Sequence, residues 1–117
     1  MKNTTGGILD ILILNLKPGT RPVFNKLYKE LSLPLLKRWN VEVLAFGPSL
    51  HGEDTYLVVR RYQDLKDRQQ SQDGYYGSDE WKQGPREQIM SLIEDYTTVV
   101  IPANDNLITG FKMIYEK

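Results

Sequence analysis

Two adjacent arginines, Arg60 and Arg61, lie in a segment rich in tyrosine and β-branched residues, Thr55–Tyr62. Such a segment predicts a β-strand, in which successive side chains point to opposite faces of a sheet. Arg60 would then share one face with Tyr56 and Tyr62, and Arg61 would lie on the other face. If both faces are covered, one guanidinium group needs an acidic partner, because an unpaired buried charge is strongly destabilising.

The acid best placed to pair with Arg60 is Asp10, which interrupts the apolar segment Ile8–Leu16. The even and odd positions of this segment are both mainly apolar, which predicts a strand that is buried on both faces. We therefore expect an Asp10–Arg60 ion pair inside a cleft or barrel. The sequence is equally compatible with a structural and a functional role for this pair, because buried charges occur in both settings.

Three large aromatic residues, Tyr75, Tyr76 and Trp81, occur together in the stretch DGYYGSDEW, Asp73–Trp81. The glycines, serine and acids around them are typical of a loop, so the rings need an apolar surface to rest on. They could wall a pocket for a small apolar or aromatic ligand. The simpler interpretation is that they plug the end of a barrel as core and interface residues. The candidate cleft combines these rings with four strand residues: Asp10, Tyr56, Arg60 and Tyr62.

The chain of 117 residues fits a single domain, 1–117, with a core of about 8–102 and a C-terminal tail of 103–117. Strands are predicted at 8–16, 41–50, 55–62 and 97–101. A first helix follows Thr20, is interrupted near Leu33 by Pro34, and ends before Asn40 in a left-handed cap position. A short helix follows Asp64, and a second main helix should run from Pro85 to Tyr96. The segment LITGFKMIYE of the tail suits either an edge strand or a short helix.

The order strand–helix–strand–strand–helix–strand is that of a ferredoxin-like α+β domain, with a four-stranded antiparallel sheet and helices on one face. The other face would be bare, yet the first strand lacks the polar alternation of a solvated face. We therefore expect this face to meet a second copy of the sheet across a two-fold axis. Two such sheets would form a homodimeric α/β barrel.

Composition excludes several classes of protein. Acidic and basic residues balance to a net charge of zero, which argues against nucleic acid or an anionic membrane surface as partner. The chain has no cysteine, which excludes disulfides and thiolate metal sites. Its longest apolar run is too short to cross a bilayer, which takes ~20 residues. We expect a cytoplasmic protein without metal or cofactor.

Two further features have ordinary structural explanations. His51 is the only histidine, and it could serve as a general base or bind a metal with Glu53 and Asp54. A lone histidine beside Gly52 is more simply part of a hairpin turn. The segment KPGTRP, Lys17–Pro22, could hold an anion at a helix start, but it also suits a capped helix that binds nothing.

Several segments resemble NIPSNAP domains in their order and spacing: ILILNLKPGT, LPLLKRW, RYQDLKDR, DEW and TTVVIP. The resemblance covers roughly residues 8–102. Asn40 stands where the family pattern leads us to expect glycine, and Gly84-Pro85 splits a helix that should be more continuous. The resemblance implies a ferredoxin-like dimeric α/β barrel. It supplies no agreed reaction and no catalytic residues to carry over.

Two functions from different classes remain open. The first is a homodimeric module that binds a small molecule or another protein. The alternative is a cofactor-independent monooxygenase or isomerase that acts on an aromatic or polyketide-like substrate, as some proteins of this fold do. Fold alone does not decide between them. The deciding feature is whether the three rings line an open cavity with Arg60 at its base, or fill it.

Overall fold

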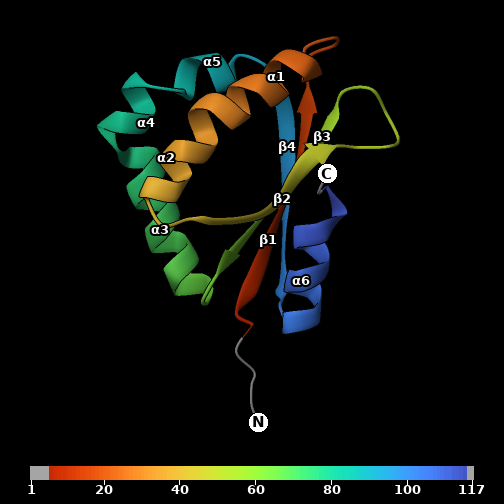
Figure 1. Ribbon diagram of the computed structural model, residues 1–117. Coiled ribbons are helices and arrows are strands. Elements are labelled where there is room, and N and C mark those ends of the chain that lie inside the picture. Colours follow the sequence, from red (N-terminus) through yellow and green to blue (C-terminus); the bar gives the residue numbers. More distant parts are fainter. Residues whose placement is uncertain (1–5, 116–117) are drawn as a thin grey trace.

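The computed structural model describes residues 6–115, which form one antiparallel sheet between unequal layers of helices (Figure 1). The sheet has four strands in the order β2-β3-β1-β4. Their bounds are β1 Ile8–Leu16, β2 Glu42–Pro48, β3 Thr55–Tyr62 and β4 Ile93–Pro102. This strand order, with a helical crossover after β1 and another after β3, confirms the predicted ferredoxin-like fold.

Most helices cover one face of the sheet, and one helix covers part of the other (Figure 1). The first layer comprises α1 Arg21–Leu27, the π-helix η1 Tyr28–Ser32, α2 Leu33–Arg38, α3 Leu65–Gly77, α4 Asp79–Gln83 and α5 Arg86–Met90. The second layer is α6 Asp105–Ile114. The tail segment is therefore a helix rather than an edge strand.

The helical path from Arg21 to Arg38 contains a π-helical turn just before Pro34. Proline has no N–H group to donate and its ring crowds the preceding turn, so a wider turn at this point avoids a conflict. The predicted interruption near Leu33 therefore takes the form of a π segment instead of a break. Asn40 has φ 60°, which confirms its predicted left-handed conformation after the helix.

The prediction that Asp73–Trp81 is a loop is wrong, because α3 continues through Tyr75 and Tyr76 to Gly77. Gly74, one of the glycines that suggested a loop, lies inside this helix. A Cβ atom there would lie 3.4 Å from the ring of Trp39. Ser78 then caps α4, and its hydroxyl accepts a hydrogen bond from the Trp81 N–H group.

The second main helix is shorter than predicted. We expected helix from Pro85 to Tyr96, but α5 ends at Met90 and β4 begins at Ile93. Pairing with β1 decides this boundary, since Leu14 lies opposite Tyr96 and Leu16 opposite Ile93. The apolar spacing that suggested a helix arises because residues of α5 and β4 meet on the same side of the sheet.

The two faces of the sheet have separate apolar cores. Beneath α1–α5 lie Leu14, Leu16, Tyr56 and Val58, together with Phe24 and other helix residues. Beneath α6 lies a smaller cluster built around Leu9, Leu44, Ala45, Val59 and Ile108. We expected the second face to be bare. This expectation is wrong in part, because the tail helix α6 covers some of that face.

Part of this second face stays open. Val99 of β4 and Ile13 of β1 are 47% and 37% exposed on the side of the sheet that carries α6.

Within residues 6–115, no helix is both long and apolar enough to cross a membrane.

Candidate functional site

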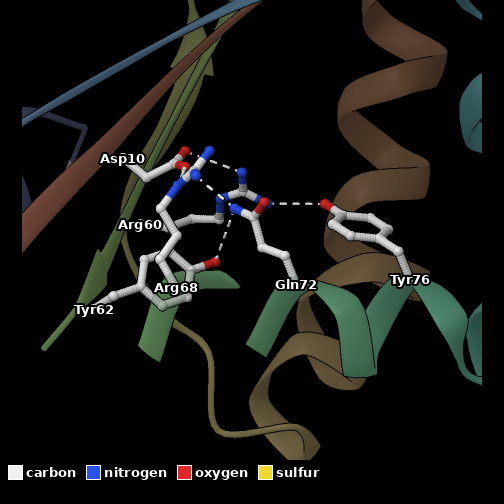
Figure 2. A network of polar contacts seen from close by, with 6 residues as sticks. All are labelled: Asp10, Arg60, Tyr62, Arg68, Gln72 and Tyr76. Atoms are coloured by element: carbon white, nitrogen blue, oxygen red, sulfur yellow. Dashed lines mark hydrogen bonds and ion pairs between the residues drawn. The ribbon is translucent and has the colours of Figure 1, made fainter. Parts of the chain in front are cut away.

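A buried carboxylate, Asp10, organises the polar centre of the helix-covered face (Figure 2). Asp10 lies directly opposite Arg60 in the pairing of β1 with β3. Its Oδ1 atom is 3.0 Å from Nη2 of Arg60, which confirms the predicted ion pair. The Asp10 side chain is fully buried and that of Arg60 is only 6% exposed, so both charges depend on each other.

Helix α3 supplies the remaining partners of this pair (Figure 2). Arg68 and Gln72 donate to Oδ2 of Asp10 over 2.6 and 3.2 Å. Tyr76 accepts a hydrogen bond of 2.8 Å from Nη1 of Arg60. Residues four apart lie on one face of a helix, so the spacing 68, 72, 76 directs all three side chains at the sheet. We call the group Asp10, Arg60, Arg68, Gln72 and Tyr76 the ionic cluster.

The charge of Arg60 is stable in this setting. Burial lowers the pKa of Arg60, but the neighbouring Tyr76, Tyr62 and Asp10 groups raise it, and the net effect is upward. A guanidinium group therefore stays cationic within the protein interior. Together Arg60 and Arg68 bring two positive charges to one carboxylate, so the ionic cluster carries an excess of positive charge.

The three rings of the predicted aromatic group pack against one another. Tyr75 and Tyr76 meet edge to face with ring centroids 4.9 Å apart, and Tyr76 and Trp81 do so at 5.2 Å. Tyr75 and Trp81 are buried, whereas Tyr76 is 38% exposed. Such pairs contribute about 0.5–1.5 kcal/mol beyond their buried area, which fixes the geometry of this wall.

A cavity of about 360 Å³ lies between the sheet and the helices, against these rings. Its volume falls in the usual range of small-molecule sites, roughly 300–1,000 Å³. Arg60, Tyr75, Tyr76 and Trp81 all line it, as the candidate cleft required. The rings therefore border an open space with Arg60 in its wall, and do not fill it.

The other residues of the candidate cleft do not line this cavity. Asp10 lies behind the cavity wall, where it forms ion pairs with Arg60 and Arg68. Tyr56 is fully buried, packs edge to face on Phe24, and donates its hydroxyl proton to Oδ1 of Asn25. Tyr62 is a core residue whose hydroxyl accepts a hydrogen bond from Gln72. Tyr56 and Tyr62 share a strand face with Arg60, so the sequence placed them on the correct side of the sheet. Both are buried in the core and do not line the cavity.

Among the wall residues that were missed in the sequence are the polar residues Ser32, Arg68, Gln72 and Arg86. Arg68 and Gln72 carried a signal, since each lies a multiple of four residues before Tyr76 on what proves to be one helix. The interpretation of Asp73–Trp81 as a loop concealed that spacing. Ser32 and Arg86 gave no pattern, because only the folded chain brings α1–α2 and α5 to the same cavity.

Unsatisfied polar atoms concentrate at this cavity. Among the described residues, the buried side-chain nitrogen and oxygen atoms without a hydrogen-bond partner are Ser32 Oγ, Arg60 Nε and Tyr75 Oη. All three residues line the cavity. Leaving a buried polar group unpaired costs about 1–3 kcal/mol, so three in one wall are an unusual concentration.

The remaining candidate sites have local structural roles. His51 is exposed in the turn between β2 and β3, as expected. Arg21 of the KPGTRP segment donates to the backbone carbonyls of Gly52 and Thr55, and the Gly19 N–H group donates to Asp54. The donors of this segment thus hold the hairpin. Nowhere in residues 6–115 do three His, Asp or Glu side chains gather to hold a metal ion.

One expected cap differs in detail. Thr20 occupies the position before α1, but its hydroxyl donates to the carbonyl of Lys17 and does not cap the helix. Trp39 is 36% exposed and donates a hydrogen bond from Nε1 to Glu80. It packs edge to face on Tyr75, so it buttresses the cavity wall from outside.

Solved structures with the same fold identify the architectural relatives of this chain. A NIPSNAP family protein from Agrobacterium tumefaciens superposes with a TM-score of 0.79 at 15% identity, over 90% of this chain and 92% of its own. A second one from that organism, of unknown function, gives 0.77 at 18% identity, over 90% and 96%. A putative antibiotic biosynthesis monooxygenase from Bordetella bronchiseptica gives 0.69 at 15% identity, over 85% and 98%.

No family model and no curated protein sequence matches the chain. The structural likeness extends over 90% of this chain and over more than nine tenths of each of the two NIPSNAP proteins. At these identities the likeness concerns architecture, and functions are not transferred with it. The chain has the ferredoxin-like fold of the NIPSNAP proteins, as its sequence pattern predicted.

Proposed function

We propose that this protein is a homodimeric, cytoplasmic small-molecule-binding protein whose ligand occupies the cavity between the sheet and α1–α5. The carrying observation is the cavity of about 360 Å³ that Arg60, Tyr75, Tyr76 and Trp81 border. Aromatic walls with a few convergent polar groups are the usual make-up of a ligand site. The residues whose buried polar atoms are unsatisfied, Ser32, Arg60 and Tyr75, all belong to this wall.

A screen for ligand-induced thermal stabilisation tests the binding function. A ligand that binds only the folded protein raises its melting temperature, and the rise grows with the logarithm of the ligand concentration once that exceeds Kd. Thr98 of β4 lines the cavity, so Thr98→Trp should fill it and abolish the shift. Thr109→Trp, an exposed change on α6, is the matched control and should leave the shift intact. Equal shifts in both variants would place the ligand elsewhere.

The dimer is proposed from the open part of the second face. Val99 and Ile13 leave apolar surface exposed beside α6, and Leu107 and Ile114, seven residues apart on one side of α6, add to it. Apolar surface of this kind is typical of a subunit interface. A two-fold axis would bury it against the same surface of a second copy.

Light scattering of purified variants tests the dimer. Val99→Lys would bury a charge at the proposed interface, so we expect it to convert a dimer into a folded monomer. The matched control is Lys66→Glu, an exposed change on α3, which covers the other face of the sheet, and it should leave the dimer intact. A wild-type protein that is monomeric at micromolar concentration would refute this part of the proposal.

A second candidate, a cofactor-independent monooxygenase or isomerase of aromatic substrates, has one supporting observation. The fold relatives include putative antibiotic biosynthesis monooxygenases, and the cavity of this chain has aromatic walls. Once the screen yields a ligand, mass spectrometry of that compound after incubation in air decides the matter. A product with added oxygen or a shifted double bond, lost in Thr98→Trp, would establish catalysis.

A further inference from the structure

The cavity is positively charged in a protein that has no net charge. Three arginines, Arg60, Arg68 and Arg86, line it, and among the described residues no acid does. Asp10 offsets part of this charge from behind the wall, through Arg60 and Arg68. The interior of a half-closed cavity has a low dielectric constant, so the remaining charge acts strongly on whatever enters.

The arginines stand among aromatic rings. The side chain of Arg68 is 21% exposed while its Nε atom is held by Asp10, and Arg86 is exposed at α5. Guanidinium groups bind carboxylates through parallel hydrogen bonds, which makes arginine the usual residue for planar anions. The rings of Tyr75, Tyr76 and Trp81 offer a flat apolar surface beside them.

The unpaired polar atoms are of the kind that an anion would satisfy. Arg60 Nε is a donor, and the hydroxyl groups of Ser32 and Tyr75 can donate by rotation. Burial raises the pKa of Tyr75 well above its ordinary value, so its hydroxyl keeps its proton near neutral pH. A neutral hydrocarbon has no acceptor to offer these donors, whereas a carboxylate has two acceptor oxygens.

Building on the proposed function, we propose that the ligand class is aromatic carboxylates. The carboxylate lies toward the arginine side of the cavity, and the ring lies against Tyr75, Tyr76 and Trp81. Asp10 serves as a positioning residue: it holds Arg60 and Arg68 in place without touching the ligand.

Calorimetric titration with paired probes tests this assignment. The acids are benzoate, 2-naphthoate and anthracene-2-carboxylate, and each has a neutral carboxamide of nearly the same shape. We expect at least one acid to bind tenfold or more tightly than its carboxamide. Affinity for that acid should fall as salt concentration rises, since salt screens the attraction of the exposed Arg86.

Substitution of Arg86 ties the preference to the cavity. Arg86→Gln should weaken binding of the preferred acid several-fold and leave binding of its carboxamide unchanged. Because Arg86 is exposed, this change spares the buried ionic cluster. Lys66→Gln removes the same charge from an exposed position on α3 that does not line the cavity, and should alter neither affinity.

The outcomes separate this inference from the proposed function. If carboxamides bind as tightly as acids and Thr98→Trp abolishes both, the cavity binds small molecules without a preference for anions, and the inference is wrong. If Lys66→Gln weakens acid binding as much as Arg86→Gln, the preference comes from overall charge and the inference is also wrong. If no probe binds at millimolar concentration and no library compound stabilises the wild-type protein, the proposed function fails with it.

Discussion

The two faces of the sheet bury different kinds of side chain, although β1 contributes to both. Its even positions include Asp10, whose carboxylate joins two arginines next to a cavity. Its odd positions lie on the side of α6. Leu9 and Ile11 belong to the apolar cluster beneath that helix, whereas Ile13 is exposed. The first face thus holds buried charges and a cavity, and the second holds an apolar contact between the sheet and α6. This difference is why we propose ligand binding at the first face and assembly at the second.

The largest expected effect is the loss of Asp10. Asp10→Asn removes the negative charge that Arg60 and Arg68 share, and leaving a buried charge unpaired costs about 3–5 kcal/mol. Denaturant unfolding should show a loss of this size. The matched control is Glu42→Gln, which breaks the exposed pair with Arg61 on the opposite face and should change stability by less than about 1 kcal/mol. Similar losses in both variants would remove the distinction between the faces.

The second expected effect concerns α6. Ile108 is 7% exposed against the sheet, so Ile108→Ala should lower the free energy of unfolding by about 2–5 kcal/mol, as large-to-small core changes do. Its neighbour Leu107 is 38% exposed, and Leu107→Ala should have a much smaller effect on the folding of the single chain. Neither change should alter a ligand bound in the cavity, since neither residue lines it. Loss of ligand binding in Ile108→Ala at a temperature where it stays folded would contradict the separation of roles.

The smallest expected effect is a gain. Tyr75→Phe removes a buried hydroxyl that lacks a partner, so the ligand-free protein should become more stable, by up to about 1 kcal/mol. The same change should weaken binding of an aromatic carboxylate. Thermal unfolding with and without the preferred acid measures both. A variant that is destabilised without ligand would show that this hydroxyl is satisfied in solution, for example by water.

The same residue has a consequence for alkaline stability. The pKa of Tyr75 is raised by burial above the value of about 10 that tyrosine has in an unfolded chain. The unfolded state therefore loses its proton first, and the stability that the shift represents is present below pH 10 and declines as the pH rises further. Wild-type protein should lose stability above pH 10 more steeply than Tyr75→Phe. Parallel curves for the two proteins would contradict this assignment.

The sequence predicted the sheet better than the helices, and the reason is physical. Strands β1 and β3 have dense apolar or β-branched sequences, and opposition of Asp10 and Arg60 follows from the pairing of two buried strands. The predicted short helix after Asp64 is the start of α3, but its continuation to Gly77 was missed because its sheet-facing side is polar. Arg68 and Gln72 point at Asp10, which removes the apolar period on which helix prediction depends.

The site was predicted in part for the same reason. The sequence revealed Arg60 because a charged residue is unusual in a buried strand. It revealed Tyr75, Tyr76 and Trp81 because large rings are unusual in a polar segment. Ser32 and Arg86 were not found, because their place in the cavity depends on how α1–α2 and α5 cross the sheet. The start of β4 was missed because pairing with β1 overrides the local apolar spacing of Ile89, Ile93 and Tyr96.

Native mass spectrometry of the protein purified without added ligand tests the central claim most directly. The account predicts a dimer in which each subunit carries extra mass from a small acidic compound, and a Thr98→Trp dimer without that mass. A monomer at micromolar concentration would contradict the role of the open apolar face. Wild-type and Thr98→Trp subunits that carry the same extra mass would contradict the role of the cavity.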